Sequence, residues 1–233
     1  MMNSLIPRTA LAALTAAGVI SSVQAGPQAQ PLFDGKSLDG WEVKSGFASY
    51  KVENGTIVGT TVEGSPNTFL CTQKTYGDFV LTFEVKCHPE LNSGVQFRSE
   101  AYAQATEIEI QGKKRKHEAG RVFGYQAEIA TSGNSGRIYD EARRATWLDT
   151  AEPTAEAKAA FKRDDWNSYR IIAQGDHITT FVNGVKVADF HDSVTAKGFI
   201  GLQVHGIKKG TGPFSVAWRN IQLRELAPGE NPS

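Results

Sequence analysis

The sequence has little cysteine, no excess charge of either sign and no apolar run of membrane-spanning length. Only two of its 233 residues are cysteines, and 25 basic residues balance 25 acidic ones. A balanced charge leaves no electrostatic footprint for nucleic acid, so we expect no nucleic-acid partner. Cys71 and Cys87 could form a disulfide in an oxidising compartment, but sequence alone does not fix the required geometry and leaves this open.

Several motifs of known chemistry are also missing. The chain has no Gly-x-Ser-x-Gly elbow, phosphate loop, dinucleotide-binding glycine fingerprint or Cys/His zinc cluster. These absences argue against a nicotinamide-dependent oxidation, and we predict no cofactor. A divalent metal is left open, because carboxylates and a histidine on one face of a sheet can hold one.

The first 25 residues have the pattern of a secretory signal peptide. One base, Arg8, precedes an alanine-rich apolar run at 10–20, and residues 23–25 end in Ala25 with small residues placed for cleavage. The run is about half the roughly 20 apolar residues that a spanning helix needs. We therefore expect a signal peptide at 1–25, no membrane insertion after its cleavage, and a periplasmic or secreted protein. The rest divides into one domain at 26–226 and a disordered tail at 227–233.

Alternating apolar and polar residues recur in short segments bounded by Gly, Asn and Asp. This pattern predicts an all-β sandwich of two antiparallel sheets, with a short surface helix at 154–162. Asn-Gly pairs at 54–55 and 183–184 predict two-residue hairpin turns. The polar segment 101–118 predicts an extended excursion and a possible groove wall, with a basic run in a solvated loop or hairpin tip. The predicted strands are 50–53, 55–59, 69–72, 79–86, 94–99, 124–130, 168–174, 177–182, 186–190, 199–205 and 214–226.

Three of these strands carry pairs of polar side chains that alternate with apolar ones. Because successive side chains on a strand point to opposite faces, each pair lies on the polar face of its strand. If the three strands are neighbours, the pairs converge in one groove suited to a polyhydroxylated ligand, an oligosaccharide for example. The pairs are Gln96 with Arg98, Gln126 with Glu128, and Gln203 with His205.

Glu128 is the best candidate for a general base, because Arg98 beside it could orient it and keep it ionised. Asp140 is the second choice, and we also assign it to substrate binding. Tyr139 and Trp147 are candidate aromatic platforms for a sugar ring. No strand carries the set of paired carboxylates that ordinary sandwich glycosidases use, so hydrolysis with two carboxylates is not well supported.

Seven segments of the chain stand out as a set and occur in this order: LFDGKSLDGW (32–41), NSGVQFR (92–98), GYQAEI (124–129), IYD (138–140), DWN (165–167), VNG (182–184) and GLQVH (201–205). Together they closely resemble the 3-keto-disaccharide hydrolase family. The resemblance runs from about residue 30 to residue 226, and the combination is specific although each segment alone is weak. It implies a concanavalin- or laminarinase-like jelly roll and the cleavage of 3-keto-glycosides by a secreted protein.

The resemblance implies a mechanism that needs one good base. A ketone at carbon 3 acidifies the proton on carbon 2, which Glu128 or His205 would remove while the carbon 1 substituent leaves. Arg98 would stabilise the enolate, and Gln96, Gln126, Gln203 and Tyr139 would orient hydroxyl groups. Two other functions stay open: a carbohydrate-binding module without catalysis, and a glycosidase that acts on unoxidised sugars.

Overall fold

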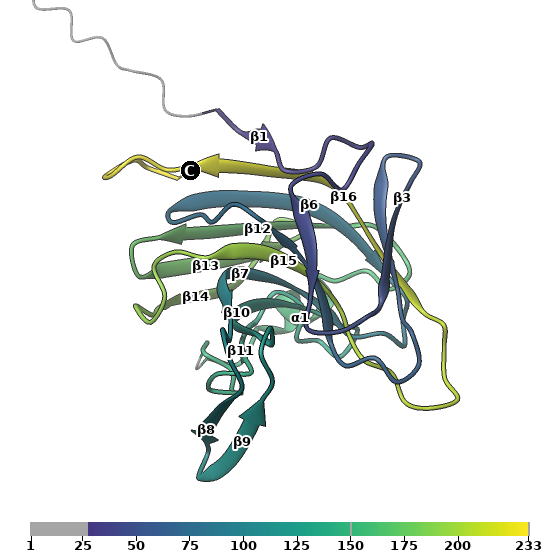
Figure 1. Ribbon diagram of the computed structural model, residues 1–233. Helices are drawn as coiled ribbons and strands as arrows, with labels where there is room; N and C mark the ends of the chain where they lie inside the picture. The colour runs from purple at the N-terminus through teal and green to yellow at the C-terminus, as the bar shows by residue number, and fades with distance from the viewer. Residues whose placement is uncertain (1–27, 150, 233) are drawn as a thin grey trace, which may run out of the picture.

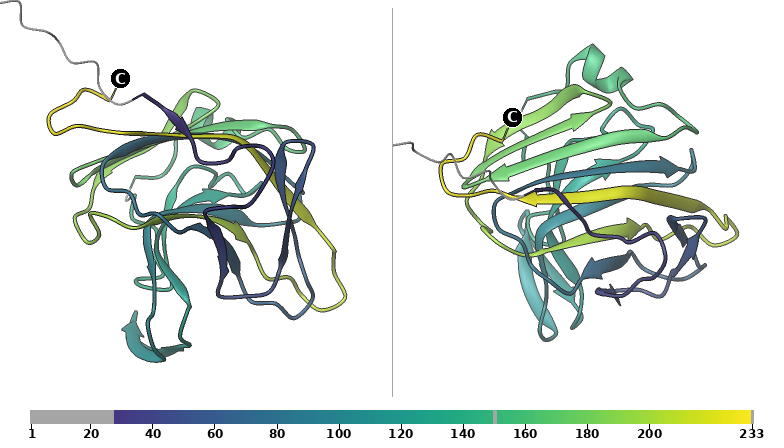
Figure 2. Two further views of the ribbon diagram at one scale, coloured as in Figure 1. Left: turned by 45° about the horizontal axis from the view of Figure 1, so that its top comes forward. Right: turned by 90° about the horizontal axis from the view of Figure 1, so that it is seen from above.

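The computed structural model describes residues 28–149 and 151–232, and the predicted signal peptide lies outside this part. Two antiparallel sheets stack face to face, and a hairpin extends away from the smaller one (Figures 1 and 2). The fold is the predicted jelly-roll sandwich. Within the described residues, no helix is long and apolar enough to cross a membrane.

In the described chain, the larger sheet has the order β14-β13-β12-β6-β16-β4-β3, and β1 pairs with β16. Its strands are β1 (Gln30–Pro31), β3 (Ser49–Glu53), β4 (Thr56–Thr60), β6 (Phe79–Cys87), β12 (Asn167–Gln174), β13 (His177–Val182), β14 (Val185–His191) and β16 (Ser215–Glu225).

The smaller sheet has the order β11-β10-β7-β15-β5-β2. One face packs on the larger sheet, and the other is the polar face that the sequence analysis singled out. Its strands are β2 (Trp41–Lys44), β5 (Thr68–Thr72), β7 (Ser93–Ala101), β10 (Val122–Ile129), β11 (Ile138–Glu141) and β15 (Phe199–Val204).

The core lies between the sheets and follows the alternation of the sequence. On β6, Phe79, Leu81, Phe83 and Val85 are buried, as their period of two predicts. The facing layer includes residues 95, 97, 127, 129, 202 and 204, also buried. The opposite parity on β7, β10 and β15 therefore points away from the core, and this positions the candidate site.

Both Asn-Gly turns are confirmed as hairpin turns. Asn54 and Gly55 join β3 to β4, Asn183 and Gly184 join β13 to β14, and all four residues have positive φ. This is the backbone of a type I′ turn, whose twist matches the flanking strands. The predicted helix is also present as α1 (Ala155–Ala159), with Thr154 as its N-cap.

Details of the strands differ from the sequence analysis. Strands β1, β2 and β11 were not predicted, and the excursion 101–118 contains a two-stranded hairpin of β8 (Thr106–Ile110) and β9 (Lys113–His117). In the tail, the carbonyl of Pro232 accepts a hydrogen bond from Arg170 at 2.6 Å. Both cysteines are buried and unpaired.

Candidate functional site

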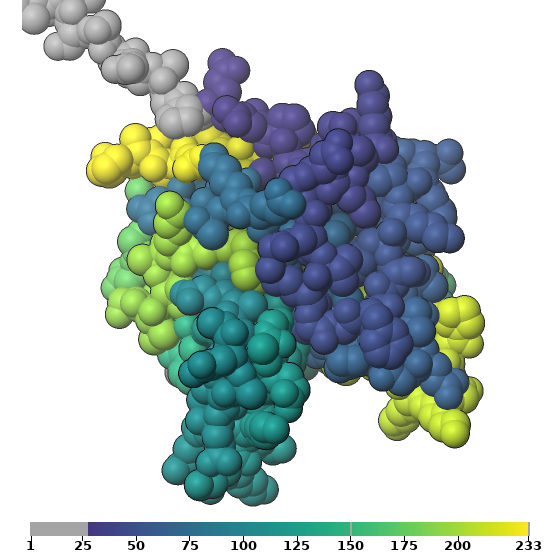
Figure 3. All heavy atoms as spheres, in the orientation of Figure 1, coloured from purple at the N-terminus to yellow at the C-terminus, as the bar shows by residue number. Residues whose placement is uncertain are grey.

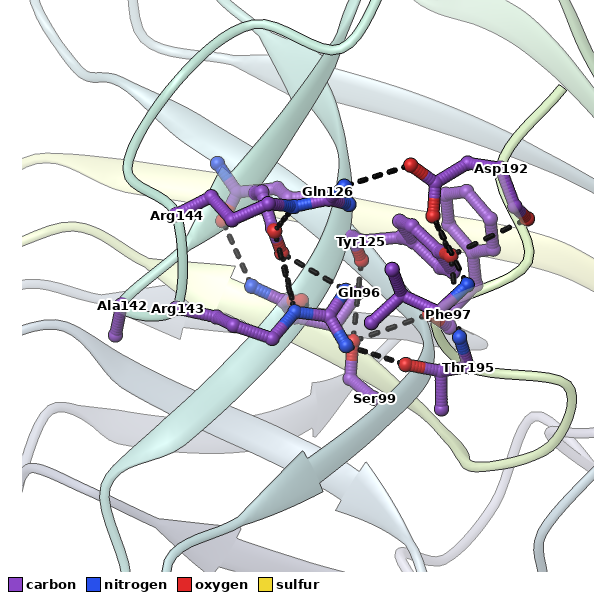
Figure 4. A network of polar contacts seen from close by, with 12 residues as sticks. Gln96, Phe97, Ser99, Tyr125, Gln126, Ala142, Arg143, Arg144, Asp192 and Thr195 are labelled. Atoms are coloured by element: carbon purple, nitrogen blue, oxygen red, sulfur yellow. Dashed lines mark hydrogen bonds and ion pairs between the residues drawn. The ribbon is translucent and has the colours of Figure 1, made fainter. Parts of the chain in front are cut away.

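Three glutamine side chains form a connected layer on the polar face of the smaller sheet. Gln126 of β10 accepts hydrogen bonds from Gln96 of β7 at 3.0 Å and from Gln203 of β15 at 2.9 Å. Ser99 donates to Gln96 at 2.7 Å, and part of this network is drawn in Figure 4. The structure thus brings the three predicted amides together, from three strands.

Gly94 allows this layer to lie flat on the sheet. It sits on β7 opposite both Glu128 and Gln203, so its missing side chain would point at the amides. A Cβ at Gly94 would come within 2.6 Å of the Gln126 side chain, closer than real contacts allow. Any side chain here would displace Gln126 and break the link between the amides.

Glu128 lies at the end of the network with two neutral partners. Gln126 donates to one carboxylate oxygen at 3.1 Å, and Asn92 donates to the other. No arginine or lysine forms a salt bridge with Glu128 in the described chain, and its residue is 7% exposed. Burial raises the pKa of Glu128 to about 7, although the hydrogen bonds from Asn92 and Gln126 act in the opposite direction. Such a carboxyl group can both take and give a proton near neutral pH.

A pocket of about 300 Å³ lies beside Asn92, the residue that donates to Glu128, and Glu128 itself does not line it. Asn92, His205 and Phe214 are among the residues that line it. Nδ1 of half-buried His205 is 2.7 Å from the carbonyl oxygen of Gly206, and because a carbonyl only accepts, Nδ1 donates. In a neutral imidazole the other ring nitrogen is then an acceptor, and it makes no hydrogen bond to the described residues. Asn92 therefore separates the two predicted bases, since it binds Glu128 and lines the same pocket as His205.

Arg98 does not lie on this face, so its predicted place beside Glu128 is wrong. Its φ of +44° marks a bulge in β7, where the register shifts against both neighbouring strands. Ser99 consequently takes the position on the groove face. The fully buried Arg98 donates to the carbonyls of Gly77 (2.8 Å) and Gly175 (2.7 Å) and to the carboxylate of Asp78 (2.7 Å). Arg98 therefore connects two turns of the fold and does not act as the cation of the groove.

Asp140, the second choice as base and a predicted substrate-binding residue, does not lie on the groove face. It pairs with core-facing Tyr125 across β10 and β11 and is fully buried. Both Arg143 and Arg144 form salt bridges with it, and Arg144 also binds Asp192 at 2.7 Å (Figure 4). Asp140 is thus the anchor of the loop after β11, and it has no surface for a substrate.

Tyr139 and Trp147, the predicted aromatic platforms, contact each other at the end of the sheet. Their rings meet edge to face with centroids 5.3 Å apart, and Tyr139 lies opposite Gln126. The guanidinium of Arg137 stacks on Trp147 at 4.7 Å. Tyr139 borders the amide layer, while one face of Trp147 is already covered.

The sequence analysis missed an ion pair on the groove face. Arg121 and Glu141 form a salt bridge, Asn67 donates to the same carboxylate oxygen at 3.2 Å, and Arg121 covers the ring of Phe69 at 5.6 Å. Nη1 of Arg121 is buried without a hydrogen-bond partner among the described residues. No strand was predicted at β11, so the face on which Glu141 lies was not assigned.

No group of three or more His, Cys, Asp or Glu side chains is placed to hold a metal ion in residues 28–149 and 151–232. The groove carboxylates instead bind asparagine, glutamine and arginine. The arrangement is therefore a protonatable carboxyl group at the end of an amide-lined floor, beside a pocket with an imidazole.

Comparison with known families identifies the chain. The model of the 3-keto-alpha-glucoside-1,2-lyase-like domain matches residues 28–224, nearly all of the described part. The chain belongs to this family. It is a glycosyl hydrolase-like or carbohydrate-binding jelly-roll protein, in agreement with the resemblance found in the sequence. No curated protein matches the chain.

Solved structures with the same fold are distant in sequence. A proposed glycosyl hydrolase from Parabacteroides distasonis has 17% identity and a TM-score of 0.56, with 85% of this chain and 94% of that one covered. The carbohydrate-binding module CBM66 of Bacillus subtilis has 17% identity and a TM-score of 0.55, covering 80% and 96%. A Bacillus subtilis protein with a galectin-like fold has 11% identity and a TM-score of 0.59, covering 86% and 96%. At these identities the likeness establishes the fold alone.

Proposed function

We propose that this protein cleaves 3-keto-glycosides by elimination, with Glu128 as the base, in the periplasm or outside the cell. Glu128 takes the proton from carbon 2, and the electron pair of that bond forms an enolate with the ketone at carbon 3. The enolate then forms a double bond between carbons 1 and 2 as the bond from carbon 1 to the leaving oxygen breaks. That oxygen takes up a proton, and later addition of water gives net hydrolysis.

The observation that carries this proposal is the environment of Glu128. A base for carbon 2 works best when its pKa is close to the working pH, and burial raises the pKa of Glu128 to about 7. Its two partners, Asn92 and Gln126, are neutral donors that orient both oxygens without holding the group permanently ionised. An ordinary surface glutamate would be a weaker base.

Other groups of the groove have supporting roles in this proposal. The acceptor nitrogen of His205 faces away from its Gly206 hydrogen bond and would take a proton from the water that adds after elimination. Arg121 forms a salt bridge with Glu141, about 13 Å along the sheet from Glu128, so it would bind the part of the saccharide beyond the cleaved ring and would not take the enolate-stabilising role predicted for Arg98. The layer of Gln96, Gln126 and Gln203 would fix the ring orientation.

The position of Glu141 disfavours a mechanism with two carboxylates. It lies opposite Gly124, four residues along β10 from Glu128. Four residues of a strand span about 13 Å, whereas catalytic pairs in glycosidases are about 5 to 9.5 Å apart. Glu141 is also engaged by Arg121. An elimination needs no second carboxylate.

A carbohydrate-binding module is the second candidate. It is favoured by the low exposure of Glu128 and by the closed hydrogen bonding of the amide floor, which suit a rigid recognition surface. The similarity of fold to CBM66 also supports a carbohydrate-binding module. In that case the ligand would bind over the floor without reaction.

Matched native and 3-keto forms of one aryl glucoside test the proposal. We expect the purified protein to release the aglycone from the keto form alone, with a product that first carries the conjugated double bond. Release from the native form would instead indicate an ordinary glycosidase. Binding of either form without cleavage would indicate the carbohydrate-binding module.

The hydrogen bond from Asn92 predicts a change in pH dependence. Because this bond lowers the pKa of Glu128, the variant Asn92→Leu should raise it. The ascending limb of kcat/KM against pH should move up by about one pH unit, the value of one hydrogen bond to a charged group. A pH profile between 5 and 9 measures this. An unchanged limb would mean that another group limits the reaction.

A further inference from the structure

A basic pocket lies between the β8–β9 hairpin and the end of the smaller sheet. Its volume is about 460 Å³, and it is distinct from the pocket beside Asn92. The hairpin provides one wall, and Figure 3 shows this teal segment projecting beyond the body of the molecule. The lining includes Lys113, Arg115, His117, Arg121, Tyr139 and Glu141.

The two faces of β9 differ in how their charges are neutralised. On the outer face, Lys114 binds Glu107 of β8 at 2.9 Å and Lys116 binds Glu118 at 3.3 Å. On the inner face, Lys113 and Arg115 lie opposite Ile110 and Ile108, so no carboxylate faces them across the hairpin. Neither forms a salt bridge within the described residues.

The inner end of the pocket also holds unsatisfied polar atoms. Nε2 of His117 and Nη1 of Arg121 are both buried without hydrogen-bond partners among the described residues. His117 is fixed by stacking on Tyr102, with ring centroids 5.3 Å apart. A buried donor without a partner is costly, and a ligand oxygen would satisfy Nη1 of Arg121, which can only donate.

The pocket borders the amide layer of the candidate site at Tyr139. Tyr139 lines it and lies opposite Gln126 in the sheet, and Glu141 lines it and is bound by Asn67. A saccharide that lies across the amide floor would therefore extend toward the hairpin. From this geometry we infer that the pocket binds an anionic substituent, a carboxylate or a sulfate, on the part of the saccharide beyond the cleaved ring. This inference rests on the proposed function.

The test compares charged and neutral substrates of the same scaffold. Keto-glucosides whose aglycone is a glucose, a glucuronate or a sulfated glucose are assayed with the double variant Lys113→Gln/Arg115→Gln. We expect the ratio of kcat/KM for charged over neutral substrates to fall about tenfold, and in the parent protein to fall with added salt. The glucuronate and sulfate arms distinguish the two sources of charge, and an effect on either one alone identifies it.

The double variant Lys114→Gln/Lys116→Gln is the matched control, because it removes the same charge from the outer face of β9. It should leave the ratio unchanged. Equal ratios in both double variants, or no preference for charged substrates in the parent protein, would overturn the inference.

Failure of the pocket inference can be distinguished from failure of the proposed function. If no keto-glucoside is cleaved, the elimination proposal fails, and calorimetry with the disaccharides themselves still measures charged over neutral affinity. A tenfold loss of that preference in the inner-face variant would support the pocket even then. Absence of any preference in binding would reject it.

Discussion

The variant Glu128→Gln should lose turnover of a 3-keto-glycoside by a factor of about 10² to 10⁴, the usual contribution of a general base. The amide keeps the shape of the side chain and can still bond to Asn92 and Gln126, so the groove should keep its geometry. Affinity for a native glucoside, measured by calorimetry, should stay within a few fold. The loss should therefore appear in kcat.

The matched control is Glu100→Gln, the same change at an exposed position of β7. It should have turnover equal to that of the parent protein. Retention of turnover in Glu128→Gln would remove Glu128 as the base and leave His205 as the remaining candidate. In that case His205→Gln should lose turnover by a similar factor.

The substitution Glu128→Gln should also change the free energy of unfolding in a pH-dependent way. The pKa of Glu128 in the folded protein, about 7, lies above its ordinary value of 4.5, so folding favours the protonated form. The stabilisation contributed by the protonated Glu128 carboxyl is complete below about pH 4.5 and is lost as pH rises through 7. Glu128→Gln should therefore gain up to about 3 kcal/mol over the parent protein at pH 8 to 9 and little at pH 4. Denaturant titrations at both pH values measure the difference.

The sequence predicted the fold well because apolar and polar residues alternate along each strand, and burial of one face requires this alternation. Phe79, Leu81, Phe83 and Val85 are buried as their spacing requires, and both Asn-Gly turns have the positive φ values that a tight hairpin needs. The same parity placed Gln96, Gln126, Glu128 and Gln203 correctly on one face. These residues lie on regular strands, where parity determines direction.

The failures occur where the strands are irregular or short. The bulge in β7 reverses the parity between Gln96 and Arg98, and no residue type in that segment indicates it. Strand β11 has four residues, too few for a clear period, so it was not predicted: Asp140 was given a role in the groove, and Glu141 was missed. Arg121 was missed because its partner, Glu141, lies on a strand that was not predicted.

Substitution of Arg98 separates a structural role from a catalytic one. Arg98→Met keeps most of the side-chain volume and removes the guanidinium, which makes three hydrogen bonds to Gly77, Asp78 and Gly175. The carbonyls of Gly77 and Gly175 and the partly exposed carboxylate of Asp78 lose their donor at once. We expect the free energy of unfolding to fall by about 2 to 4 kcal/mol, from the loss of three hydrogen bonds made by a charged group.

Two measurements on this variant decide which role Arg98 has. The denaturation midpoint in urea should fall, whereas Arg163→Met, at an exposed position, should change the free energy of unfolding by less than about 0.5 kcal/mol. At a temperature where the variant is folded, kcat should stay within a few fold of the parent value, because Arg98 points away from the groove face that carries Glu128. A loss of kcat by two orders of magnitude in the folded variant, with stability intact, would show that Arg98 acts in catalysis. It would contradict the position away from the groove face that the bulge gives Arg98.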